Sequence, residues 1–99
     1  MQKDGYKIIR SSMGVFAGIL DPKSTETEKI IREARRLWYW DGAASLSQLA
    51  MEGVKNPDNC KFSVPVNQTT LTSPYTGFEI LEVTDKARES IGSVKVWTR

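Results

Sequence analysis

Two short β-prone runs separated by a tight turn, at residues 6–10 and 15–20, open the chain. The four residues between them (Ser-Ser-Met-Gly, 11–14) favour a turn, so the sequence predicts a β-hairpin. Gly14 and Gly18, beside and within the second run, indicate a bulge or the close approach of another backbone. The chain therefore begins with an antiparallel pair of strands, which residues 21–24 end in a further turn.

The segment at residues 25–40 supports two interpretations. Its apolar residues fall at helical spacing, with Thr25 and Glu28 placed like a capping box. Its end, residues 36–40, is instead aromatic and β-prone, and turn formers follow at once. We expect a strand at 36–40, whereas the pattern leaves residues 28–34 open between helix and strand.

The second half of the chain alternates further strands with two helical patterns. A helix is expected at residues 43–52, because Ser45 and Gln48 have capping-box spacing and Gly53 suits a left-handed C-terminal position. A shorter one is expected at 85–91, capped by Thr84 or Asp85 and stopped by Gly92. Strands are expected at 61–66, where Pro65 favours a sheet edge, and at 69–72, 78–83 and 94–97, with a turn at 74–77.

These elements together predict an α+β fold. We expect a curved antiparallel sheet or partial barrel of five to six strands, with two short helices packed against it. The chain has 99 residues, of which 39% are hydrophobic, enough for one core and too few for two. Residues 1–99 are therefore expected to form a single domain.

The sequence lacks the residues that several common catalytic and metal-binding sites require. It contains no histidine and one cysteine, Cys60, which we interpret as a small buried residue at the start of a strand. The sequence therefore lacks the commonest metal ligand and a base that could activate the thiol. It also contains no second cysteine and no phosphate-binding glycine loop. We expect no enzyme, no metal, no cofactor and no evident small-molecule substrate. Neither a signal peptide nor a membrane-spanning run is visible, so we expect a cytoplasmic protein without membrane contact.

Basic and aromatic residues lie next to each other at residues 32–40. Arg32, Arg35 and Arg36 can hold phosphates, and Tyr39 with its neighbouring tryptophans can stack on unpaired bases. Net charge is only +2, which is small for a dedicated nucleic-acid binder. This pattern makes weak, sequence-tolerant nucleic-acid binding a candidate function.

A different interpretation of the same residues is structural. In a regular strand, Trp38 and Trp40 share one face and Tyr39 takes the other, so the tryptophans can belong to the core. The arginines can then pair with nearby acids such as Glu26, Glu28 and Glu33. If the tryptophans are exposed instead, aromatic residues beside arginine are typical of a protein-interaction hot spot.

The segment Ala-Arg-Arg-Leu-Trp-Tyr-Trp at 34–40, followed by Gly-Ala-Ala-Ser-Leu at 42–46, resembles a family of small phage and prophage proteins of uncharacterised function. The resemblance implies strand structure at 35–40 and expression in a bacterial host, and it supplies no reaction. We expect a non-enzymatic accessory or protein-binding module that binds a host or phage protein or itself. The alternative is the nucleic-acid binder, and the candidate binding residues are Arg32, Arg35, Arg36 and Tyr39.

Overall fold

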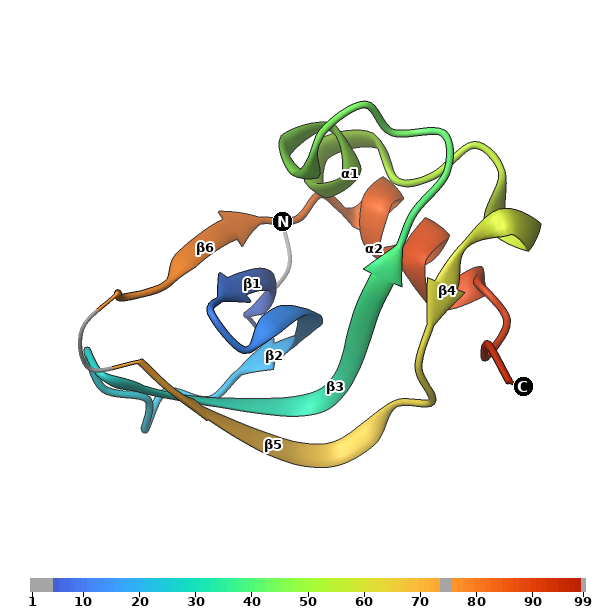
Figure 1. Cartoon of the computed structure of the whole chain (residues 1–99). Helices are drawn as coiled ribbons and strands as arrows, with labels where there is room; N and C mark the ends of the chain where they lie inside the picture. Colours follow the sequence, from blue (N-terminus) through green and yellow to red (C-terminus); the bar gives the residue numbers. More distant parts are fainter. Residues whose placement is uncertain (1–4, 74–75, 99) are drawn as a thin grey trace.

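The structure of the protein, a computed structural model, describes residues 5–73 and 76–98. That part of the chain contains six strands, two α-helices and one short 3-10 turn. In chain order they are β1 (Tyr6–Ser11), β2 (Gly14–Leu20), β3 (Glu28–Tyr39), α1 (Leu46–Glu52), the 3-10 turn (Pro57–Asn59), β4 (Lys61–Phe62), β5 (Val66–Thr72), β6 (Glu79–Glu82) and α2 (Asp85–Ser93). An open antiparallel sheet with two helices confirms the predicted α+β fold (Figure 1).

The long strand β3 is the centre of the sheet. One edge of β3 pairs with β2, while its other edge pairs with β5 over the first half and with β4 over the second half. Beyond β2 lie β1 and then β6. Strands β4 and β5 at one end of the sheet do not pair with β6 at the other end, so the curved sheet stays open (Figure 1).

The predicted hairpin is confirmed. Strands β1 and β2 pair in register from Tyr6 opposite Ile19 to Ser11 opposite Gly14. Residues 28–34, which the sequence left open between helix and strand, belong to β3. Because this segment pairs on both edges, the backbone hydrogen bonds of two ladders outweigh its helical spacing.

A bulge bends β3 where it faces the middle of β2. The register between the two strands shifts between Ala17 and Ile19, and Glu33 on β3 adopts a left-handed φ of 50°. Gly18 faces the bulge, and a Cβ at this position would lie 2.7 Å from the carbonyl oxygen of Arg32. The bulge and close backbone approach expected at Gly18 are therefore both present.

Both predicted helices form, but α1 begins at Leu46, three residues after the predicted start at 43. The Ser45 side chain caps α1 by accepting from the Gln48 N–H, and Gly53 ends the helix with φ 78°. The Thr84 side chain caps α2 in the same way, accepting from the Ala87 N–H. Helix α2 continues through Gly92 to Ser93, so it ends two residues later than expected and Gly92 does not stop it.

The predicted strand at residues 61–66 is wrong in extent. Only Lys61–Phe62 forms β4, and Val66 already starts β5, with Val64 and Val66 both exposed. The chain changes partner here, because it leaves the second half of β3 and crosses to the first half around Pro65. The alternating apolar pattern therefore spans two strands.

The predicted strand at residues 94–97 is wrong as well. This segment makes one parallel bridge, between Val96 and Phe62, and forms no strand. In the turn predicted at 74–77, residues 74 and 75 lie outside the described part of the chain. The remaining predicted strands, at 69–72 and 78–83, correspond to β5 and β6.

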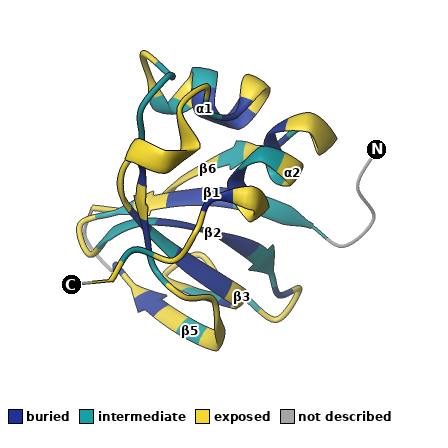
Figure 2. Ribbon diagram, turned by 90° about the vertical axis from the view of Figure 1, so that its right-hand side faces the viewer, coloured by how far each residue is buried: buried dark blue, intermediate teal, exposed yellow. Residues whose placement is uncertain are grey.

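Two hydrophobic clusters lie on the two faces of the sheet. The larger joins the sheet to both helices and contains Ile8, Ala17, Leu37, Leu49, Ala50, Cys60, Phe62, Val83, Ala87, Ile91 and Val94. The smaller lies under β5 and contains Ile9, Phe16, Ile31, Ala34 and Leu71. Buried residues line β1, β2 and β3, whereas β5 is mostly exposed (Figure 2). Among the described residues, no helix has the length and apolar character needed to span a bilayer.

Candidate functional site

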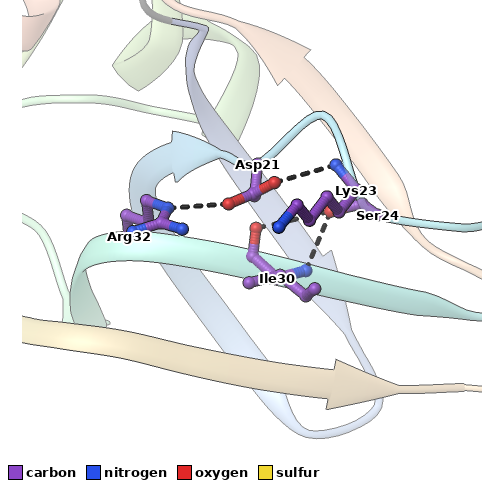
Figure 3. Close-up of polar contacts among 5 residues, drawn as sticks. All are labelled: Asp21, Lys23, Ser24, Ile30 and Arg32. Carbon is purple, nitrogen blue, oxygen red and sulfur yellow. Dashed lines mark hydrogen bonds and ion pairs between the residues drawn. The ribbon is translucent and has the colours of Figure 1, made fainter.

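Arg32 lies on β3, and its side chain contacts the turn that joins β2 to β3. Its Nε lies 2.7 Å from Oδ2 of the buried Asp21 (Figure 3). The other carboxylate oxygen accepts from the Lys23 backbone N–H at 2.8 Å, and Ser24 Oγ accepts from the Ile30 N–H at 2.9 Å. The Lys23 N–H and then the Arg32 guanidinium lower the pKa of Asp21 below its ordinary value. The ion pair with Arg32 thus stabilises this turn.

Arg35 points into the interior and is only 5% exposed. Its Nε donates to the Ser63 carbonyl at 2.6 Å, Nη1 donates to the Ile91 carbonyl at 2.8 Å, and Nη2 donates to the Val94 carbonyl. The guanidinium also lies 5.4 Å from the centre of the Phe62 ring. Burial lowers the pKa of Arg35 from its usual value. This arginine joins β3 to the end of α2 and is closed to a phosphate.

Arg36 packs on the hairpin. Its guanidinium carbon lies 4.5 Å from the centre of the Phe16 ring, and Nη1 donates to the Met13 carbonyl at 3.1 Å. The three arginines therefore point to three different places and form no common phosphate site. The alternative pairing with acids at positions 26, 28 and 33 is also wrong, because among the described residues Asp21 is the carboxylate that pairs with this set.

Tyr39 is the one predicted binding residue that lies on an open aromatic surface. It lines a groove of about 670 Å³ together with Trp38, Lys61 and Trp97, here termed the aromatic groove. Trp38 is 52% exposed and Tyr39 is 50% exposed. The Trp38 and Trp97 rings meet edge to face with centroids 5.6 Å apart, and Lys61 Nζ lies 5.2 Å from the centre of the Trp97 ring. The groove thus combines large aromatic area with one cation.

The interpretation that places both Trp38 and Trp40 in the core is therefore half wrong. Trp40 does pack against the larger core cluster, but Trp38 is exposed beside Tyr39. Regular alternation fails here because the register with β4 shifts between Leu37 and Tyr39, and because the strand ends before Trp40. Two consecutive aromatic residues consequently reach the same groove.

Lys61 and Trp97 are groove residues that the sequence did not reveal. Both lie far along the chain from Trp38, and the Val96–Phe62 bridge brings the C-terminal segment beside β4. The backbone N–H of Trp97 donates to the Phe62 carbonyl at 2.9 Å, which fixes that segment in place. The sequence feature that could have indicated Trp97 is the β-prone run at 94–97, which ends in this aromatic residue.

Comparison with protein families gives a match over residues 5–91 to a domain of unknown function (DUF6948). The chain belongs to this family. The DUF6948 match spans all six strands and most of α2, and it includes Trp38, Tyr39 and Lys61, whereas Trp97 follows its end. No curated protein and no solved structure matches the chain. The DUF6948 match confirms the expected membership of an uncharacterised family.

Within the DUF6948 match, Cys60 lies in the core as expected. It is buried, and its Sγ accepts from the Asp41 backbone N–H at 3.3 Å. Burial raises the pKa of the thiol, which favours the unreactive protonated form. Among the residues that the structure describes, no three Asp, Glu or Cys side chains are grouped as metal ligands.

Proposed function

We propose that the chain is a non-enzymatic accessory protein of a phage or prophage, and that it binds a host or phage protein through the aromatic groove. It acts in the cytoplasm of the bacterial host. The observation that supports this proposal most strongly is the exposure of Trp38 and Tyr39 in one groove. The resemblance of residues 34–46 to small phage proteins supports the proposed origin.

Energetic arguments favour a protein partner for this groove. Trp and Tyr are enriched among the residues that dominate protein interfaces, because each buries a large area with few rotatable bonds. Trp38 is held in place against Trp97, so little side-chain freedom is lost when a partner covers it. Lys61 places one charge at the same site and can pair with an acid of the partner.

Single-stranded nucleic acid is the second candidate, and the two exposed rings favour it because bases stack on aromatic side chains. It ranks lower because most of its affinity depends on cations that contact phosphates. Arg35 is buried, and Arg32 and Arg36 make contacts elsewhere on the protein, so Lys61 is the cation that lines the groove.

Quantitative capture from nuclease-treated bacterial lysate tests the proposal. A protein retained by the wild type is identified by mass spectrometry, purified and titrated against wild type, Trp38→Ala and Tyr39→Ala. We expect Trp38→Ala to weaken binding about 30-fold or more, as for the loss of a hot-spot residue. Met51→Ala removes an exposed apolar side chain on α1 and is expected to leave the affinity unchanged.

The same variants separate the two candidate functions. A single-stranded oligonucleotide titrated at about 50 and 200 mM salt reports on nucleic-acid binding, whose affinity falls steeply with salt. Tight binding that Tyr39→Ala abolishes would select the nucleic-acid candidate. Full retention of the protein partner by Trp38→Ala and Tyr39→Ala, both shown to be folded by circular dichroism, would refute a role of the groove.

A further inference from the structure

Strand β5 leaves one of its two edges without a partner. It pairs with β3 from Val66 opposite Ala34 to Thr72 opposite Glu28, and no helix or strand of the described residues lies on its other side (Figures 1 and 2). Beyond this ladder, no hydrogen bond from elsewhere in the described chain reaches the backbone of residues 66–72. Alternate N–H and C=O groups of β5 therefore point to solvent, as in any edge strand.

The side chains of β5 do not protect this edge. Its sequence, Val-Asn-Gln-Thr-Thr-Leu-Thr, contains no charged residue and no proline. Soluble proteins usually guard a long edge strand with such residues because they block pairing with a second chain. The residues on the solvent face, at positions 66, 68, 70 and 72, are exposed, uncharged and mostly β-branched, a composition that favours strand pairing.

The opposite outer strand, β6, provides a contrast within the same sheet. Glu79 and Glu82 lie at its two ends, and each pairs with a cation on β1, Arg10 and Lys7 respectively. If β6 paired antiparallel with its own copy over its full length, Glu79 would lie opposite Glu82. Like charges in that arrangement destabilise a ladder. Strand β5, rather than β6, is therefore suited to pair with the same strand of a second copy.

We propose that β5 pairs antiparallel with β5 of a second copy of this chain around a twofold axis at Thr69. Full overlap of the seven residues places Val66 opposite Thr72 and Gln68 opposite Thr70 in both halves. This pairing satisfies the outward backbone groups and brings no like charges together. The β5 edge and the aromatic groove lie on opposite halves of β3, so self-pairing does not depend on the proposed binding of another protein.

Two double variants test both the dimer and its register. Gln68→Glu with Thr70→Glu places glutamates opposite each other at two symmetric positions, whereas Gln68→Glu with Thr70→Lys places opposite charges there. Gln68→Glu is expected to leave the monomer folded, because position 68 lies opposite the positively charged Arg32 on β3. Sedimentation of the full chain at about 5 to 500 µM is expected to give a monomer–dimer equilibrium. The double-glutamate variant is expected to weaken the affinity of the dimer about tenfold or more. The variant with glutamate and lysine is expected to keep the affinity near the wild-type level.

Amide hydrogen exchange locates the interface independently of the variants. Alternate amides of β5 are expected to exchange more slowly as the wild-type concentration rises through the dimer range, and not in the glutamate double variant. A chain that stays at 11.1 kDa at every concentration would overturn the proposal and would leave the edge to an extended segment of another protein. A dimer of equal affinity in wild type and both double variants would overturn it as well.

Discussion

Arg35 carries a positive charge into the interior and balances it with carbonyl dipoles. Two of the carbonyls it contacts, those of Ile91 and Val94, lie at the C-terminal end of α2, where unpaired carbonyls carry partial negative charge. The third contact, Ser63, lies in the link between β4 and β5. One side chain therefore fixes a helix end and a crossing segment to the central strand.

Replacing Arg35 should cost far more stability than replacing its neighbour. Arg35→Met removes three charge-assisted hydrogen bonds from a buried site, so we expect the free energy of unfolding to fall by about 3 kcal/mol or more. Arg36→Met removes one bond at the surface and serves as the control, with an expected loss of about 1 kcal/mol. Urea denaturation measures both, and equal losses would contradict the structural role of Arg35.

Asp21 should make stability depend on pH in the acid range. Its folded-state pKa lies below the ordinary value of 3.8, so the folded state binds a proton less readily than the unfolded chain. The stabilisation is present above about pH 4 and is lost as the pH falls through the folded-state pKa. We expect Asp21→Asn to lower stability at neutral pH and to flatten its decline on acidification.

Thermal unfolding measured from about pH 6 to pH 2.5 checks this prediction. Glu52→Gln is the matched control, because Glu52 is an exposed acid that makes no ion pair with any described residue. An acid decline in Asp21→Asn as steep as that of the wild type would show that other carboxylates control the transition.

At the scale of elements, the bulge in β3 depends on the glycine that faces it. A Cβ added at Gly18 would lie 2.6 Å from Cγ2 of Ile31 and 2.7 Å from the Arg32 carbonyl oxygen. Because one of these neighbours is backbone, we expect Gly18→Ala to destabilise the protein by about 3 kcal/mol. Gly92→Ala meets open space in α2 and should instead stabilise by about 0.5 to 1 kcal/mol. Losses of similar size from both substitutions, measured by chemical denaturation, would be inconsistent with this packing.

The sequence predicted elements best where local chemistry determined them. Ser45, Gly53 and Thr84 act within their own helix ends, so their capping roles could be recognised from spacing alone. Residues 28–34 and 61–66 were harder, because their structure depends on which half of β3 each strand pairs with. The aromatic groove was the hardest feature to predict from the sequence, because Lys61 and Trp97 reach Trp38 through contacts between distant segments.

At the scale of the whole molecule, β3 belongs to both hydrophobic clusters. Ile31 and Ala34 in its first half lie in the smaller cluster, whereas Leu37 in its second half lies in the larger one. Neither cluster can be lost without releasing part of the same strand. This arrangement favours unfolding in one cooperative step, as expected for a single domain.

Cooperative unfolding predicts that damage to either cluster reaches both. Leu71→Ala creates a cavity in the smaller cluster and Leu49→Ala in the larger, and each is expected to cost about 3 kcal/mol. Tryptophan fluorescence reports chiefly on the larger cluster, where Trp40 packs, while amide exchange of β5 reports on the smaller. Both signals should shift together in both variants, because β3 links the two regions. If Leu71→Ala released β5 while the fluorescence transition stayed at the wild-type midpoint, the clusters would unfold separately and the single-domain prediction would be wrong.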